Sequence, residues 1–503
     1  MESFLPFGVG AWIFISLYIG SLLIVGALAY KERKENTLKD FYLAGSGFGF
    51  VVLVLTLYAT QYSGNSLFGF TGMTYRIGFS WIMSVQFMIA IVIFYQLIAV
   101  RLYRLCEKRA YITPVDYIQD RFQNRMLSLL ASIVMILALS NFLLAQLMAM
   151  GRALQGLAGA NSDLAYHYGV ITLALIMVIY GTLGGIRAVA WTDMLQGSVL
   201  LCGFLILLFV LHAEFGSLSV ATTLIADSGK ADMLSKVRPP DAARLREWLS
   251  YLLIVGMGGA LYPHAIQRIY AARSERVLRL SLSVMAFLPF FTTLVAVVAG
   301  IYALAYVGGF EGAASDQVLG RLLRQVQEAS LFGYCLVVLL FAAVLSAIMS
   351  TADSALLSIS SMLSKDIYSG FINPEASEAD MTRVGKMCSW SLVVVLVSLA
   401  IVLREESSLV KLLDRKFDVL VQLVPAFMLG LRWSGMRADA TLLGLFVGLI
   451  VSLTLAFGPF TFIEGGKLWG FHPGLYGLLV NLLIVLVGSY LASKRWVQNS
   501  RLQ

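Results

Sequence analysis

The sequence predicts an all-α polytopic membrane protein with about thirteen transmembrane helices. Many stretches run for about 20 residues with few or no charges, which is the length that crosses a hydrocarbon core of about 30 Å. The lysines and arginines gather between these stretches, as they do in the cytoplasmic loops of membrane proteins. Of the 503 residues, 59% are hydrophobic and only 13% are charged, whereas about a quarter are charged in a typical soluble domain.

Hydropathy places the expected helices in order along the chain. The first apolar stretch is too long for a cleavable signal peptide and lacks its basic start, so we expect it to remain as a membrane span. The ranges are 7–30, 46–75, 78–105, 126–155, 165–184, 191–213, 247–272, 277–306, 332–366, 383–403, 408–432, 438–458 and 471–494.

The connectors between these ranges predict the orientation of the chain. Basic residues cluster at 31–34, 101–125, 273–279 and 494–495, and the alternation of inside and outside puts all of these clusters on one face. The positive-inside rule makes that face cytoplasmic, with the N-terminus outside and the C-terminus inside. We therefore expect a multi-pass protein of a bacterial inner membrane, in contact with lipid.

Other functional classes find little support in the sequence. The net charge of +8 comes from the connectors, so we expect no nucleic-acid partner. The chain carries no P-loop, no metal-spaced His/Cys set and no nucleophile motif, which argues against an enzyme. The cysteines have neither CxxC spacing nor a paired histidine, so we interpret them as free thiols. They are Cys106, Cys202, Cys335 and Cys388.

Two of the apolar ranges are interrupted by residues that break a helix. The second range contains the segment YSGNS at 62–66, and the seventh contains a Gly-rich stretch at 256–259 followed by Pro263. Interrupted helices at corresponding positions of two halves are the best sequence indication of a transporter's binding site near the membrane midplane. Alternatively, these glycines serve only close helix packing.

This pairing predicts two halves of five helices each, with extra helices at both ends. Residues 1–45 form an extra helix and a cytoplasmic connector, and 46–213 form the first half, spans 2–6. Residues 214–246 form an extracytoplasmic connector, and 247–432 form the second half, spans 7–11. Residues 433–503 form two extra helices and a cytoplasmic tail.

The ninth range carries small and hydroxyl-bearing residues on one face. Ala347, Ser350, Thr351 and Ser354 are spaced i, i+3, i+4 and i+7, which places them on the same side of a helix. Sodium is a hard cation that takes oxygen ligands, and hydroxyls together with the freed carbonyls of a broken helix supply them. The alternative is a packing face whose hydroxyls bond back to the preceding turn.

Two acids stand inside apolar ranges. Asp353 lies in the middle of the ninth range and Asp193 near the start of the sixth. A carboxylate in the membrane costs several kcal/mol unless it is paired or solvated, so such residues are functional candidates. Alternatively, Asp193 is an acid at a helix N-terminus near the cytoplasm, stabilised by the helix dipole. The pair would also serve a proton-coupled carrier.

Other polar residues in the apolar ranges have two interpretations each. Gln146 is a candidate solute contact, whereas we expect Arg152 to extend to the outer interface. His264 would serve a proton relay or accept a structural hydrogen bond at the helix break. The charges at 411–418 form a solvated outer rim or a vestibule that attracts an anion. They are Lys411, Asp414, Arg415, Lys416 and Asp418.

Three segments together resemble the sodium:solute symporter family. They are GGIRAVAWTD at 184–193, the segment 342–368 with its core AAVLSAIMSTADS, and Pro263-His264 followed by Arg268. The resemblance runs from span 2 to span 11. It implies a five-plus-five inverted-repeat (LeuT-like) core with broken helices 2 and 7 and sodium-coupled symport of a small solute. It also implies that a single chain is sufficient, although a dimer is possible.

The resemblance also implies a sodium site between the break of span 2 and span 9. On the family's pattern, its ligands are the backbone carbonyls of Ala59, Tyr62 and Ala347. The hydroxyls of Ser350 and Thr351 complete the site.

Some members of the family have a second cation position one turn along span 9. Its counterparts here are Asp353 and Ser354, with Asp193 opposite. Hydroxyl residues are usual where this chain has Asp353. An added carboxylate would either strengthen this site or carry a proton instead.

The solute positions differ from those of the family's proline transporters. Those proteins have Trp and Tyr where this chain has Val255 and Gly259, Tyr in place of Phe142, and an acid in place of Gln61. The chain is more similar to the pantothenate and monocarboxylate branch, whose carboxylate could be received by a half-helix N-terminus. We expect a small anionic solute, in contact with Gln61, Ser63, Asn65, Phe142, Gln146, Val255, Gly259 and Tyr262.

Three other functions remain as alternatives. They are a sodium/amino-acid symporter of the proline type, a proton-coupled carrier and a transporter-like sensor. Sensing is disfavoured because we expect no soluble signalling domain after the last span.

Overall fold

The computed structural model describes residues 9–31, 37–158, 162–183, 185–459 and 466–500, which form helices and short connections without a strand. Residues 32–34 of the first basic connector and Gly184 of the GGIRAVAWTD segment lie outside the described residues, as do the side chains of 494–495. Each of the expected apolar ranges coincides with one helix or with a helix that is broken or bent.

The first half of the chain runs from the N-terminal helix to a long helix that carries Asp193. Its long elements are α1 (Val9–Lys31), α3 (Phe50–Gln61), η2 (Asn65–Gly69), α4 (Phe70–Ile77), α5 (Met83–Arg109), α7 (Arg125–Ala158), α8 (Ser162–Leu183) and α9 (Gly185–Phe215). Short helices α2 (Leu38–Leu43) and α6 (Pro114–Phe122) lie in the connectors.

The second half repeats this pattern after two short helices, α10 (Leu218–Ala226) and α11 (Ala231–Val237). It comprises α12 (Ala242–Gly259), α13 (Pro263–Ala271), α14 (Glu275–Met285), α15 (Leu288–Tyr306), α16 (Val318–Ala329), α17 (Leu331–Ser361), η6 (Met362–Ile372), α18 (Glu378–Val402), α19 (Leu409–Leu420), η7 (Val421–Leu423) and η8 (Pro425–Leu429). The chain ends with α20 (Ala438–Phe457) and α21 (Pro473–Ser500).

The described helices make this a multi-pass membrane protein. By length and composition, eight of them can cross a membrane, or nine if the bent pair α12–α13 counts as one span. The number thirteen and the division of the chain into five segments therefore stay predictions.

Both expected helix breaks are confirmed. α3 ends at Gln61, and Tyr62 takes an extended conformation (φ −100°, ψ 110°) before the helix resumes. α12 and α13 meet at a bend of 48°, and Tyr262 at this bend has φ −55° and ψ 123°. Pro263 then begins α13, a position where its missing N–H costs no hydrogen bond. The breaks free backbone groups in the middle of the protein.

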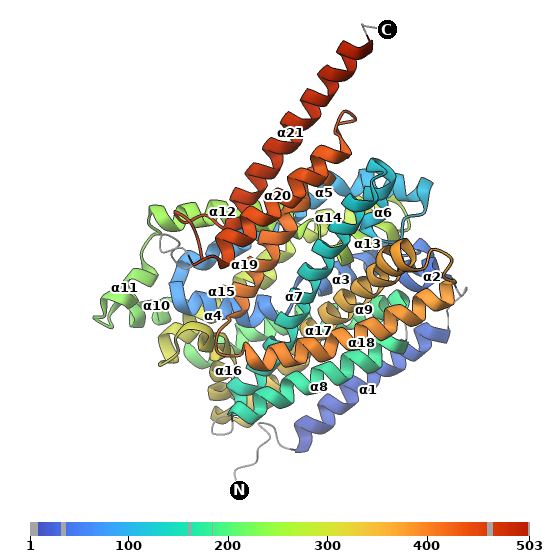
Figure 1. The fold of residues 1–503 in the computed structure, drawn as a ribbon. Helices are drawn as coiled ribbons and strands as arrows, with labels where there is room; N and C mark the ends of the chain where they lie inside the picture. The colour runs from blue at the N-terminus through green and yellow to red at the C-terminus, as the bar shows by residue number, and fades with distance from the viewer. Residues whose placement is uncertain (1–8, 32–36, 159–161, 184, 460–465, 501–503) are drawn as a thin grey trace.

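The helix that carries the hydroxyl face lies in the centre of the packing. α17 contacts α3, α7 and α9, and α1 lies against α8 and α9. Figure 1 shows α1, α8 and α18 running side by side along one edge, while α20 pairs with α21, which projects from the body. The hydroxyl face of α17 is therefore enclosed by other helices.

Gly300 on α15 allows α4, the second part of the broken span 2, to approach closely. A Cβ atom at Gly300 would lie 2.8 Å from the carbonyl oxygen of Thr71 and would also collide with Thr74 on α4. By contrast, a Cβ at Gly20 on α1 would meet no atom of the described residues within 4 Å.

We expect Gly300→Ala to lower the free energy of unfolding by about 1–3 kcal/mol, because overpacking forces the backbones apart. Thermal melting of the purified protein in detergent would measure the change, with Gly20→Ala as the matched control. Equal melting temperatures for Gly300→Ala and Gly20→Ala would contradict the close packing of α4 on α15.

Candidate functional site

The hydroxyl face of α17 meets the end of α3 at the break. The Ser350 hydroxyl donates a hydrogen bond to the Ala59 carbonyl oxygen at 2.8 Å, and the Thr351 hydroxyl contacts the same oxygen at 3.3 Å. Thr351 also bonds to the Ala347 carbonyl at 2.9 Å. Four of the five residues proposed from the sequence for the sodium site thus form one cluster of oxygens.

The chemistry of this cluster suits a hard monovalent cation. Its ligand groups are two hydroxyls and two carbonyls, all of them buried. Oxygen is the ligand atom that such cations take. Tyr62, the fifth residue, immediately follows α3, and its backbone N–H bonds to the Tyr58 carbonyl at 3.1 Å. These residues fit a sodium ion by ligand type.

A second polar cluster lies further along α17. The Arg268 guanidinium of α13 donates to Asp193 Oδ2 at 3.0 Å and to the Ser354 hydroxyl at 2.7 Å. Its Nε donates to the Thr56 hydroxyl at 2.9 Å, and Thr56 in turn donates to Asp193. The cluster therefore joins Asp193 and Ser354 through a cation supplied by the protein itself.

Asp353 lies beside this cluster and has no hydrogen-bond partner in the described part of the chain. Its side chain is 2% exposed, and neither carboxylate oxygen has a hydrogen bond with any residue that the structure describes. Buried polar groups are nearly always satisfied, so this carboxylate is an exception among the buried side chains that the structure describes. Whether this added carboxylate strengthens a second cation site or carries a proton stays a prediction.

The sequence interpretation missed the role of Arg268. It named this arginine only as part of a motif, although a charge five residues after Pro263 inside an apolar range should have been matched to an intramembrane acid. The alternative view of Asp193 as a helix N-terminal acid is wrong, because α9 begins at Gly185 and Asp193 lies more than two turns inside it.

Three of the expected solute contacts make hydrogen bonds at the break of span 2. Gln146 Oε1 accepts from the Gly64 N–H at 3.0 Å, and its Nε2 donates to the Phe142 carbonyl at 3.2 Å. Asn65 Nδ2 donates to the Leu409 carbonyl at 2.9 Å, while the Ser63 N–H contacts the Ser66 hydroxyl at 3.4 Å. Gln146 therefore connects the break to α7.

Two other expected contacts line a small apolar pocket. Gln61 and Gly259 face it together with Ile91, and its volume of about 20 Å³ has room for a single water. A Cβ at Gly259 would lie 2.7 Å from Ile91, so this arrangement leaves no space for an aromatic side chain at that position. Val255, one turn earlier, is fully buried.

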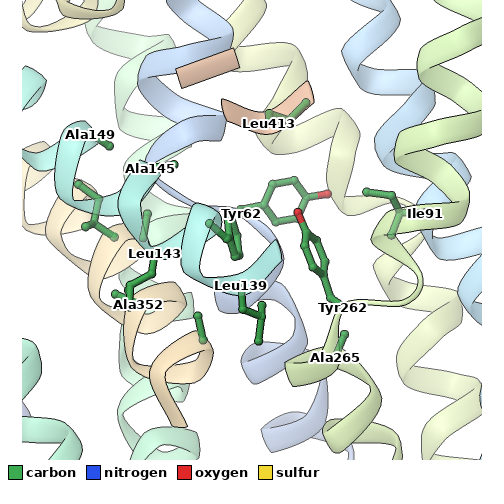
Figure 2. Packing of buried hydrophobic residues seen from close by; sticks show 14 of the residues in the cluster. Tyr62, Ile91, Leu139, Leu143, Ala145, Ala149, Tyr262, Ala265, Ala352 and Leu413 are labelled. Carbon is green, nitrogen blue, oxygen red and sulfur yellow. The ribbon is translucent and has the colours of Figure 1, made fainter. Parts of the chain in front are cut away.

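Aromatic rings gather beside the break of span 7. Phe142 of α7 stacks on Tyr262, with ring centroids 5.2 Å apart, and the His264 ring lies 5.0 Å from Tyr262 and 5.8 Å from Phe142. Figure 2 shows Tyr62 and Tyr262 among buried apolar residues near the two breaks. We call Phe142, Tyr262, His264, Lys416 and Phe417 the aromatic cluster.

Lys416 brings a basic side chain into this cluster. Its side chain is 2% exposed, and its Nζ lies 3.6 Å from the Phe142 ring centroid and 5.2 Å from that of Tyr262. A buried ammonium costs several kcal/mol, whereas a desolvated cation–π contact returns about 2 kcal/mol. The rings alone would therefore not offset the burial of a charged Lys416.

Three expectations for polar side chains are wrong. The outer-rim interpretation fails for Lys416 and Asp418, because α19 packs against α7 and buries both. Arg152 does not extend to the interface; it is 1% exposed and donates to Gln155 at 3.0 Å. The ring of His264 makes no structural hydrogen bond to the described residues.

A larger hollow of about 690 Å³ lies between the end of α4, the start of α12 and the segment before α21. Four of its lining side chains are basic and two are acidic, which gives it a positive excess that would attract anions. The charged lining residues are Arg76, Arg244, Arg246, Lys467, Asp241 and Glu247.

Comparison with known proteins gives consistent matches over most of the chain. Residues 41–448 match the model of the sodium:solute symporter family. A sodium/proline symporter of Haemophilus influenzae is 26% identical over 460 residues, which cover 86% of each chain.

Solved structures share the fold. A sodium-coupled sialic acid symporter in a substrate-bound, outward-open state has a TM-score of 0.77 at 20% identity, covering 96% of this chain and 98% of that one. MhsT in complex with L-phenylalanine has a TM-score of 0.54 at 13% identity, covering 87% and 98%. The fold is the LeuT-like inverted repeat.

Proposed function

Because the chain belongs to the sodium:solute symporter family and is a sodium-coupled symporter, we propose that its solute is a small organic carboxylate of the monocarboxylate or pantothenate type. Sodium binds between α3 and α17 in this proposal. Its ligands are the carbonyls of Ala59, Tyr62 and Ala347 and the hydroxyls of Ser350 and Thr351.

The convergence of two α17 hydroxyls on one α3 carbonyl carries the proposal for sodium. Ser350 and Thr351 both contact the Ala59 oxygen, which is freed because α3 ends only two residues later. Unwound carbonyls of this kind coordinate sodium in transporters with broken helices.

Three observations support a carboxylate solute. Proline and sialic acid, which the two relatives are named for, both carry a carboxylate group. The hollow near α12 has a basic excess, and the N-terminal end of α13 at Pro263 would favour a negative group. The named relatives also keep a proline-type amino acid as the second candidate solute. However, the packing at Gly259 leaves no room for the large aromatic side chain expected there in a proline transporter.

Gln146 offers a physical route for coupling between sodium and solute. Its amide joins Gly64, at the break beside the sodium ligands, to the backbone of Phe142 in the aromatic cluster. Coupling requires that sodium favour the conformation that binds the solute. Occupation of the break by sodium would act on the aromatic cluster through this side chain.

A second coupling cation would lie at Asp193, Asp353 and Ser354. Arg268 already neutralises one charge there, so the unpartnered Asp353 would take either a second sodium or a proton. Proton coupling through this pair remains the alternative mechanism.

The remaining features of the proposal follow from the sequence. The protein lies in a bacterial inner membrane, with the N-terminus outside and the C-terminus in the cytoplasm, as the basic connectors indicate. A single chain contains both broken helices and is sufficient for transport. No enzymatic activity is proposed.

Thermal stability of the purified protein in sodium and in choline buffer tests the proposal. Ligands that bind the folded state raise its apparent stability, so we expect a sodium-specific rise that lactate, pyruvate, acetate or pantothenate enlarges. A rise with L-proline alone would favour the amino-acid alternative. Stability that follows pH and ignores sodium would contradict the sodium site.

A further inference from the structure

Lys416, the lysine of the aromatic cluster, faces no counter-charge among the residues that the structure describes. No hydrogen bond or ion pair joins the Lys416 ammonium to any residue that the structure describes; its contacts are the rings of Phe142, Tyr262 and Phe417. The acids of its own helix have other partners, since Asp418 accepts from Arg415 at 3.1 Å and Asp414 faces His472 at 3.6 Å.

A second unsatisfied group faces the same rings. Both ring nitrogens of His264 are buried and lack a partner among the described residues, while its imidazole stacks beside Phe142 and Tyr262. Whichever tautomer it adopts, a neutral imidazole presents one N–H donor. Two buried donors from different helices, α13 and α19, therefore flank one pair of aromatic rings.

Native proteins seldom leave two buried donors unsatisfied at one place without a role for them. Burial of an unpaired ammonium is costly, and an anionic group supplied by a ligand would satisfy it. Charge-assisted hydrogen bonds from an ammonium to a carboxylate are among the strongest in proteins. The aromatic rings would exclude water and pack against the apolar part of the ligand.

We propose that Lys416 binds the carboxylate group of the transported solute, with the His264 N–H as a second donor, in the aromatic cluster between α7, α13 and α19. This assignment rests on the proposed function and adds the residues that would select an anion over a neutral solute. It adds to the expected solute contacts Phe142 and Tyr262 two residues to which the sequence analysis gave other roles.

Lys416→Met keeps the length of the side chain and removes its charge. Binding is measured as the concentration of solute that gives half of the maximal thermal shift in saturating sodium, with L-lactate, pyruvate, acetate, pantothenate and L-proline as probes. For every probe that stabilises the wild type, we expect at least about a 30-fold weaker binding in Lys416→Met, because a buried charge pair loses one partner.

His264→Phe tests the second donor separately, because it keeps the stacked ring and removes both nitrogens. We expect weaker binding of the same probes, by about tenfold. Lys411→Met is the matched control, since Lys411 lies on α19 but is exposed. It should bind all probes as the wild type does.

The sodium-induced shift without solute separates the two proposals. It should persist in Lys416→Met, which shows that the variant is folded and that the sodium site is intact. Unchanged carboxylate binding in Lys416→Met would overturn the role of Lys416 and leave the carboxylate solute standing. A wild type that binds none of the carboxylates would overturn both.

Discussion

Arg268→Met is expected to be strongly destabilising. Arg268 and Asp193 are 1% and 0% exposed, and removal of one partner leaves an uncompensated charge in the membrane interior. Breaking a buried ion pair costs about 3–5 kcal/mol. The variant also loses the hydrogen bonds from Arg268 to Thr56 and Ser354. Thermal melting in detergent, together with the yield of monodisperse protein, would measure the loss.

A double substitution distinguishes charge from packing. Asp193→Asn combined with Arg268→Met removes both charges, so it should recover part of the stability lost in Arg268→Met alone. Arg279→Met is the control for loss of an arginine, because Arg279 is 59% exposed in its pair with Glu275. A double variant no more stable than the single one would show that the ion pair is not the origin of the effect.

The second large effect is expected at the sodium site. Ser350→Ala and Thr351→Ala each remove one hydroxyl from the α17 face that contacts Ala59. A hydrogen bond to a charged group is worth about 1.5–3 kcal/mol, so each variant should raise the sodium concentration for half-maximal transport by about 10- to 100-fold. Uptake into proteoliposomes at a fixed solute concentration, over a series of sodium concentrations, would measure the shift.

The matched control is Ser360→Ala on the same helix. The Ser360 hydroxyl contacts Tyr42 at 3.3 Å and lies away from α3, so this variant should keep the sodium requirement of the wild type. Because sodium and solute binding are coupled in a symporter, a higher solute concentration should partially restore transport by Ser350→Ala at low sodium. Unchanged sodium dependence in both Ser350→Ala and Thr351→Ala would contradict the assignment.

The sequence by itself determined the features that are local to one segment of the chain. The low charge and apolar stretches predicted the membrane helices, and Gly64 and Pro263 predicted the two breaks that the structure confirms. The spacing of Ser350 and Thr351 placed both on one helical face. Such features depend on backbone preferences and on the helical period, and both are determined by residues that are close together in the sequence.

Only the tertiary structure decided which polar groups meet and how deeply they lie. Asp193 and Arg268 are 75 residues apart in the sequence, and their pairing follows from the packing of α9, α13 and α17 around one point. Lys416 looks like a surface charge among the other charges of its helix, yet α19 lies against α7. The free energy of a charged side chain is set by the helices around it, and the pattern of its own helix does not contain that information.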